Sequence, residues 1–155
     1  HTMAHKNALL STPADIRNDF QASIRLHREL TGDALKYFRP PWGISTPFVN
    51  NYIKKYHMRR VLWDVMAEDW EGGTTSRTIS AKLKERVFDG AVICLHDAGE
   101  DTGGAKGAPR RTIEALIHTI PWLKAQGYQF LTMDEYIKGV DSRVIQQRKK
   151  RLLWP

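Results

Sequence analysis

The chain has 155 residues, of which 41% are hydrophobic and 26% charged, a composition typical of a globular domain that excludes disorder for most of its length. The net charge of +7 is partly concentrated at Arg148, Lys149, Lys150 and Arg151. Two interpretations of these four residues stay open: a solvated helix end, or contact with an anionic polymer such as a cell-wall polyanion, lipid headgroups or nucleic acid.

The first half of the chain predicts two helices and two strands. A helix is predicted over 12–32, because a Thr-Pro pair opens the segment, apolar residues recur at helical spacing and a glycine ends it. A short strand follows at 35–38. A second Thr-Pro pair opens a helix over 46–53, and the apolar run at 60–66 predicts a second strand.

The second half continues the alternation of helices and strands. A helix is predicted over 75–87, and an apolar strand over 91–95 contains the single cysteine, whose neighbours predict a buried thiol. A long helix begins at Pro109, with a kink or a break expected at Pro121. A last strand is predicted over 128–132, directly followed by a last helix.

Repeated strand–helix units with nearly continuous apolar strands predict an α/β fold with a parallel sheet and helices outside it. Functional residues of such folds collect after the carboxyl ends of the strands. The segments in those places are 39–43, 68–70 and 96–97, which hold arginine, tryptophan, carboxylate and histidine side chains. We therefore expect a polar site at this edge of the sheet.

Four short motifs resemble, in their order and spacing, those of the polysaccharide deacetylases, the NodB-homology family 4 of the carbohydrate esterases. They are His-Thr-Met-Ala-His at 1–5, Arg-Pro-Pro-Trp-Gly at 39–43, Glu-Asp-Trp at 68–70 and Leu-His-Asp at 95–97. Alone, the two histidines at 1–5 would also fit the remnant of an affinity tag, so the order of the motifs carries the resemblance. It extends to about residue 137.

The resemblance implies part of an irregular (β/α)7-type deacetylase barrel. The family's first motif, Thr-Phe-Asp-Asp-Gly, supplies its catalytic base and its third metal ligand, and that motif does not occur in the chain. We therefore expect residues 1–140 to be the C-terminal portion of a deacetylase domain that lacks its first strand or strands. Residues 141–155 are then a basic C-terminal extension.

The resemblance also implies a role for each polar motif residue. His1 and His5 would bind a divalent metal, zinc or alternatively cobalt or nickel, and the missing aspartate would be the third ligand. His96 would be the general acid, Asp69 its charged partner, and Arg39 the tether of the aspartate base. Each assignment has an alternative. His1 and His5 could be solvent-exposed, His96 could only hydrogen-bond at a strand end, and Arg39 could form a structural ion pair.

Four further residues are expected to bind the substrate. Flat indole rings stack on the C–H faces of sugars, and Trp42 and Trp70 would flank a groove, although each could equally be packing. Leu95 would line a pocket for the acetyl methyl group, although it is also a good core residue. By the resemblance Pro41 belongs to the same substrate-binding set.

The implied activity is metal-dependent hydrolysis of N-acetyl groups from amino-sugar polymers or oligomers, chitin-like or peptidoglycan-like, by a bacterial enzyme of the cell envelope or a secreted one. The 155 residues alone are expected to be inactive, because the base is missing. The alternative is a catalytically inactive glycan-binding relative, since Met66 stands where the family's fourth motif has its first aspartate. A specific nucleic-acid-binding module is disfavoured, because aromatic and basic residues are not interleaved.

Overall fold

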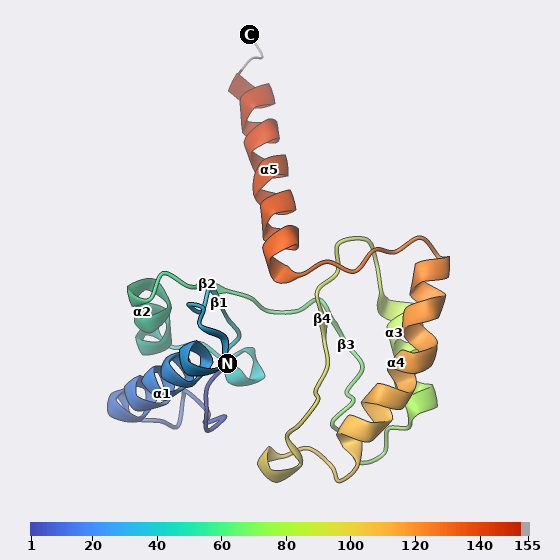
Figure 1. The fold of residues 1–155 in the computed structure, drawn as a ribbon, viewed down its shortest axis with the longest axis horizontal. Coiled ribbons are helices and arrows are strands. Elements are labelled where there is room, and N and C mark those ends of the chain that lie inside the picture. The colour runs from blue at the N-terminus through green and yellow to red at the C-terminus, as the bar shows by residue number, and fades with distance from the viewer. Residues whose placement is uncertain (153–155) are drawn as a thin grey trace. The chain divides into compact units, whose positions relative to one another are not determined.

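The computed structural model describes residues 1–152, with side chains as far as residue 143, and alternates helices with short strands (Figure 1). In chain order the elements are α1 (Pro13–Thr31), β1 (Tyr37–Phe38), η1 (Pro41–Gly43), α2 (Pro47–Lys55), β2 (Arg59–Arg60), β3 (Val65–Met66), α3 (Ser76–Arg86), β4 (Ile93–Cys94), η2 (Glu100–Thr102), α4 (Ala108–Ala125) and α5 (Met133–Leu152). The mixture of helices and partial sheet is the predicted α/β class.

The strands form two parallel pairs within the described residues. β1 pairs with β2, with Tyr37 opposite Arg59, and β3 pairs with β4, with Val65 opposite Ile93. The single strand predicted at 60–66 is therefore wrong, because the backbone changes partners along it. The amide of Val61 still donates to the carbonyl of Phe38, whereas three residues later the backbone bonds to Val92 instead.

The predicted helix starts are confirmed, and side-chain caps explain them. Thr12, Thr46 and Thr75 cap α1, α2 and α3, each accepting a hydrogen bond from the backbone amide three residues on. These caps satisfy amides that have no partner inside the helix. α1 ends at Gly32, whose φ of 76° is left-handed and favours glycine.

The cap of α1 provides a test of local stability. The Thr12 hydroxyl accepts from the amide of Asp15 at 3.1 Å and donates to its carboxylate at 2.7 Å. Thr12→Ala is expected to lower the free energy of unfolding by about 1 kcal/mol, because the first turn of α1 then has an amide without its side-chain acceptor. Urea unfolding of the variant measures this. Thr12→Ser, which keeps the hydroxyl, should unfold at nearly the parent midpoint, and an equal loss in both variants would contradict the capping role.

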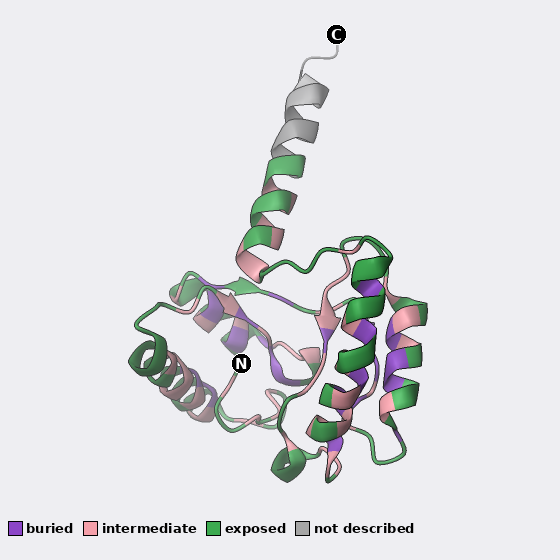
Figure 2. Cartoon of the chain, turned by 45° about the vertical axis from the view of Figure 1, so that its right-hand side comes forward, coloured by how far each residue is buried: buried purple, intermediate pink, exposed green. Residues whose placement is uncertain are grey.

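Two apolar clusters form the core, and buried residues line one side of the helices that contribute to them (Figure 2). One cluster joins α1 and α2 to β1, with the rings of Phe20 and Phe38 stacked 4.3 Å apart. The other packs α3 and the start of α4 on β3, through Val65, Ala67, Ile79, Leu83 and Ala115. Each cluster thereby anchors one parallel strand pair.

For the later part of the chain, the expected break at Pro121 and the expected strand at 128–132 are wrong. α4 continues through Pro121 to Ala125, because a proline removes only one backbone donor, and Gln126 donates to the carbonyl of Trp122. The alternative expectation of a kink at Pro121 stays a prediction. Residues 128–132 form no strand, although they are apolar. A strand needs a neighbouring strand for its backbone groups, and this segment pairs with none in the described structure, where Phe130 and Leu131 are more than half exposed.

The chain divides into the units His1–Leu116 and Ile117–Pro155. All the candidate site residues lie in the first unit. α5 runs continuously across residue 140, and the side chains of Arg148, Lys149, Lys150 and Arg151 lie outside the described residues, so the extension at 141–155 and its anionic contact stay predictions. Among the described residues, no helix is both long enough and apolar enough to cross a lipid bilayer.

Candidate active site

A buried carboxylate holds a histidine at the carboxyl ends of β3 and β4. Asp69 follows β3 and is fully buried, and His96 follows the neighbouring parallel strand β4. One carboxylate oxygen lies 2.9 Å from Nδ1 of His96, and the other accepts the backbone amide of the same residue at 2.7 Å. Because adjacent parallel strands end at one edge, two residues 27 positions apart in sequence meet there.

The surroundings of Asp69 favour its charged form. Burial raises the pKa of this carboxyl, but hydrogen bonds from the side chain and backbone of His96 and from Thr112 outweigh burial, and the pKa lies below its usual value. A carboxylate that stays ionised can orient an imidazole and stabilise its positive form. The pair therefore has the chemistry of a histidine acid with its supporting carboxylate.

The lowered pKa of Asp69 predicts a dependence of stability on pH. A carboxyl with a folded pKa below its unfolded value of about 3.9 contributes stability that is fully present above pH ~4. That contribution is lost as the pH falls through the lower, folded pKa. Asp69→Asn is therefore expected to be less stable than the parent at pH 7, with a smaller difference at pH 2–3. Urea unfolding across this range tests the prediction, and a constant difference would contradict it.

The residue before Asp69 is held by α3, which the sequence did not indicate. Glu68 has a left-handed backbone, with φ of 49°, which is unfavourable for a side chain of this size. Its carboxylate accepts from Lys82 at 2.6 Å and from Arg86 at 2.7 Å. The same two cations also donate to the carbonyls of Ala67 and Met66, so α3 fixes the backbone that leads into Asp69. The spacing of Lys82 and Arg86 by four along the predicted helix was the available signal.

The histidines at 1 and 5 meet through a bend and not through a helical turn. Their ring centroids are 5.0 Å apart, and the ring of His5 lies 4.4 Å from that of Trp42. The chain bends at Met3 and Ala4, and His5, which follows, has a left-handed φ of 47°. Nδ1 of His1 lies 2.5 Å from the carbonyl of Arg39, and the Ser23 hydroxyl donates to the carbonyl of His1. The segment is thus attached to both α1 and the loop after β1.

Arg39 lies between the histidine segment and the strand that precedes His96. Its Nη1 approaches Sγ of Cys94 at 3.6 Å, and its guanidinium carbon lies 6.0 Å from the centroid of the Trp63 ring. Its Nε is buried and has no hydrogen-bond partner within the described structure. The predicted burial of Cys94 is confirmed, and burial raises the pKa of its thiol, which makes the thiol unreactive.

The structure thus forms two groups of the predicted site residues. His1, His5, Arg39 and Trp42 form one, and Asp69, Trp70 and His96 the other, with the Trp70 ring 5.1 Å from the ring of His96. The groups are close enough for charge on His96 to lower the pKa of His5 in addition to the larger effect of burial. Of the remaining substrate candidates, Leu95 packs against the core cluster of β3 and α3, and Pro41 is buried.

His1 and His5 have the chemistry of metal ligands. Burial holds the pKa of His5 below its usual value, so the ring is neutral at pH 7, and its buried Nδ1 has no hydrogen-bond partner among the described residues. Nδ1 of His1 is directed at the carbonyl of Arg39, so Nε2 is the nitrogen of this ring that would bind a metal. Neutral imidazoles are ligands for zinc and similar ions. Among the side chains that the structure describes, as far as residue 143, no three histidine, cysteine or acidic groups gather as a metal site would need, so these two fit as part of a ligand set.

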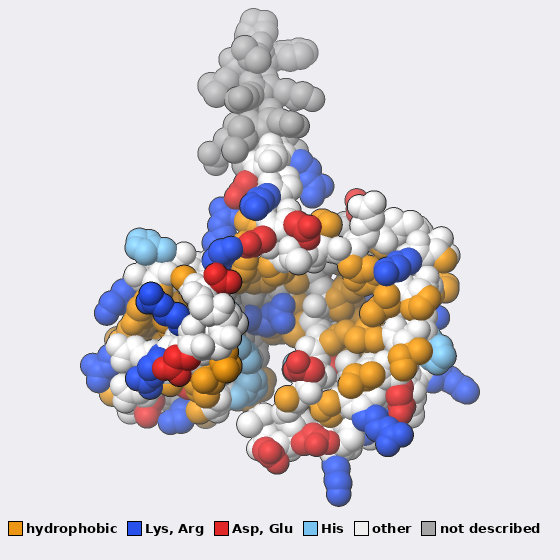
Figure 3. All heavy atoms as spheres, in the orientation of Figure 1, with side chains coloured by type: hydrophobic (Ala, Val, Ile, Leu, Met, Phe, Trp, Pro, Cys, Tyr) orange, Lys and Arg blue, Asp and Glu red, His pale blue; other side chains and the backbone are white. Residues whose placement is uncertain are grey.

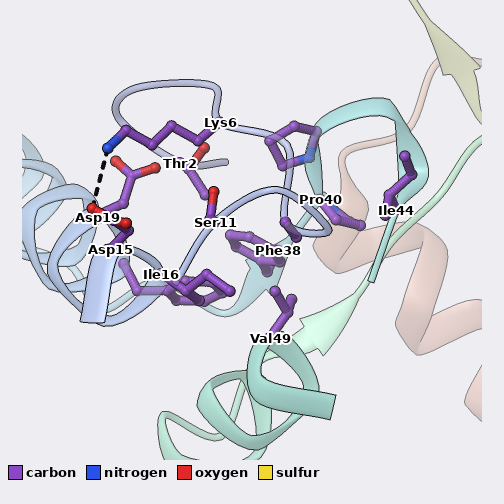
Figure 4. A pocket seen from close by; sticks show the side chains of 13 residues that line it. Thr2, Lys6, Ser11, Asp15, Ile16, Asp19, Phe38, Pro40, Ile44 and Val49 are labelled. Atoms are coloured by element: carbon purple, nitrogen blue, oxygen red, sulfur yellow. Dashed lines mark hydrogen bonds and ion pairs between the residues drawn. The ribbon is translucent and has the colours of Figure 1, made fainter. Parts of the chain in front are cut away.

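The cavity between the histidine segment and α1 is too small for a sugar. Figure 4 shows it beside Thr2, Phe38 and Pro40, with the ion pair of Lys6 and Asp15 at its edge. Its volume of about 20 Å³ has room for a single water molecule. Trp42 does not line this cavity, and it is 53% exposed. On the face drawn in Figure 3, basic side chains are scattered among acidic and apolar ones and form no continuous stripe.

The family model described as polysaccharide deacetylase matches residues 1–61. A peptidoglycan-N-acetylglucosamine deacetylase of Bacillus cereus is 29% identical over 140 residues, which cover 89% of this chain and 62% of that protein. The chain therefore spans less than two thirds of the length of this relative.

Solved structures show the same fold. A family 4 acetyl xylan esterase from Clostridium thermocellum, in complex with a cobalt ion, is 29% identical, with a TM-score of 0.75 over 89% of this chain and 62% of the other. A family 4 pseudoenzyme from Bacillus anthracis is 23% identical, with a TM-score of 0.71 over 88% of this chain and 44% of the other, and shows the fold alone. These likenesses confirm the α/β fold of the deacetylase type.

Proposed function

The chain belongs to the polysaccharide deacetylase family, and from this premise we propose that it supplies part of a metal-dependent site that removes N-acetyl groups from amino-sugar polymers or oligomers. The observation that carries the proposal is the buried Asp69 that holds His96 at the edge of the β3–β4 pair. The histidine pair at 1 and 5 supports it, since His1 is bonded to the loop after β1 and burial lowers the pKa of His5.

Amide hydrolysis breaks the bond between the acetyl carbon and the sugar nitrogen. Water adds to the carbonyl carbon, and the bond from this carbon to the nitrogen then breaks. The nitrogen takes up a proton and departs as an amine, and acetate is the other product. His96 is the proposed donor of that proton, through Nε2, since Nδ1 is engaged by Asp69. The charged carboxylate stabilises the imidazolium that precedes the transfer.

His1 and His5 would hold a divalent ion, which we propose to be zinc, with cobalt or nickel as alternatives. When bound, such an ion supplies Lewis acidity, which activates water and polarises the acetyl carbonyl. Arg39, whose buried Nε has no partner among the described residues, is suited to orient a carboxylate base. Trp42 and Trp70 would stack on sugar rings beside this centre.

We propose an amide substrate in preference to an acetyl ester. An amine leaves only after it has been protonated, whereas an ester oxygen is a better leaving group, so a positioned acid matters more for the amide. Chitin-like and peptidoglycan-like glycans both carry such N-acetyl groups. The names of the relatives, a peptidoglycan deacetylase and an acetyl xylan esterase, cover both chemistries.

The experiment measures acetate release from an N-acetylglucosamine oligomer and from acetylated xylan. The protein tested carries a segment with the Thr-Phe-Asp-Asp-Gly motif before His1 and is loaded with zinc, cobalt or nickel. Release of acetate from the oligomer is expected, with less from xylan.

A protein that binds the oligomer and the metal but releases no acetate would overturn the proposal. It would favour the inactive glycan-binding alternative, for which the observation is Met66, an apolar side chain on β3 three residues before Asp69.

A further inference from the structure

A threonine of α4 contacts the carboxylate that holds His96. Thr112 is buried, and its hydroxyl lies 2.9 Å from Oδ2 of Asp69 and 3.2 Å from the carbonyl of Ala108. Thr112 lies outside the motifs described above, 43 positions from Asp69 in sequence. The contact therefore exists only because α4 packs against the strand end.

The Thr112 hydroxyl donates its hydrogen bond to the Asp69 carboxylate and not to the carbonyl of Ala108. A hydroxyl has one proton, so it can donate to only one of its two neighbours. Asp69 is ionised, and a hydrogen bond to a charged acceptor is stronger than one to a neutral carbonyl. The shorter of the two distances is also the one to the carboxylate.

Three donors then fix the rotation of the carboxylate. Oδ2 accepts from Thr112 and from the backbone amide of His96, while Oδ1 faces Nδ1 of the imidazole. Without the Thr112 hydroxyl, Oδ2 would accept only from the backbone amide of His96. Because Asp69 is buried, water could not easily replace the lost donor. The carboxylate could then turn, and the imidazole would lose its fixed partner.

We propose that Thr112 is a positioning residue of this site. Its hydroxyl holds the Asp69 carboxylate in the rotation that engages Nδ1 of His96, which keeps Nε2 for proton transfer. Only the use of that proton rests on the proposed function, whereas the hydrogen-bond arrangement does not. The titratable groups that face Asp69 are His96 and, close enough for the carboxylate to raise its pKa, the Cys94 thiol.

The test is nuclear magnetic resonance of the 155-residue chain, which needs no turnover. Thr112→Val keeps the shape of the side chain and removes the donor. The pKa of the Asp69 carboxyl, followed by its carbon signal, is expected to rise. The ring nitrogen signals of His96 are expected to change from the single Nδ1–H form toward a mixture of tautomers. Thr112→Ser keeps the hydroxyl and should restore both signatures.

Thr31→Val is the matched control, because the Thr31 hydroxyl also donates to the carbonyl four residues earlier on a helix, 2.9 Å away at His27, and contacts no site residue. Should Thr112→Val not fold, Thr112→Ala removes the same donor and is expected to move both signals in the same direction. Unchanged signals of Asp69 and His96 in the folded variant would overturn the proposal. Unchanged signals would not affect the deacetylase proposal. Conversely, a lack of acetate release would not affect the positioning role of Thr112.

Discussion

Replacing His96 with alanine is expected to slow N-acetyl hydrolysis by a factor of about 10²–10⁴, the usual cost of losing a positioned acid. The amine then has to leave with a proton taken from water. Binding of zinc should be unchanged, because His96 is proposed as an acid and not as a ligand. The measurement is acetate release by this chain with a segment bearing the Thr-Phe-Asp-Asp-Gly motif joined before His1, together with calorimetry of zinc binding.

Controls for this variant come from the same chain. His118→Ala changes an exposed histidine of α4 and should leave the rate at the parent value. Asp69→Asn should slow the reaction in the same direction as His96→Ala, since a neutral amide cannot stabilise the imidazolium. A His96→Ala variant that retains full activity would show that another group protonates the leaving amine.

The 155-residue chain alone is expected to release acetate at a negligible rate, even with added zinc. Among its described residues, His1 and His5 are not joined by a third histidine, cysteine or acidic side chain in a metal site. The absence of a positioned base alone costs about 10²–10⁴ in rate, and a weakly held metal adds to this loss. Turnover by this chain at the rate of the motif-bearing protein would mean that the base lies within residues 1–155.

Zinc binding separates the contribution of the histidine pair. The 155-residue chain should bind zinc weakly, and His5→Ala should remove the heat of binding, because one imidazole remains. His27→Ala, a partly buried histidine of α1, should bind zinc as the parent does. Equal binding by the His5 variant and the parent would contradict the assignment of His5 as a ligand.

Local chemistry made the helices of this protein predictable from sequence. Threonine caps at Thr12, Thr46 and Thr75 start α1, α2 and α3, and each cap acts on amides within three residues. The strands were less predictable, because a strand depends on a distant partner. Residues 60–66 divide between two pairs, and residues 128–132 pair with no described strand although their composition suits one.

The candidate site shows the same division. Motif order in the sequence singled out Asp69 and His96, and the alternation of strands and helices predicted that they follow strands. The sequence could not indicate that Thr112 donates to the carboxylate. The spacing of Lys82 and Arg86 places both on one helix face, but only the structure shows that they hold the strained Glu68 beside Asp69.

By itself, therefore, the sequence determined the helix starts, the α/β class and the residue types at the strand ends, since these depend on neighbours along the chain. Tertiary structure alone decided how the side chains meet. The bend at residues 3–4 brings two imidazole rings to 5.0 Å, and the packing of α4 places the Thr112 hydroxyl 2.9 Å from Asp69. The physical reason is that a hydrogen bond requires an approach within about 3 Å, and for residues 43 positions apart only the packing of separate elements provides it.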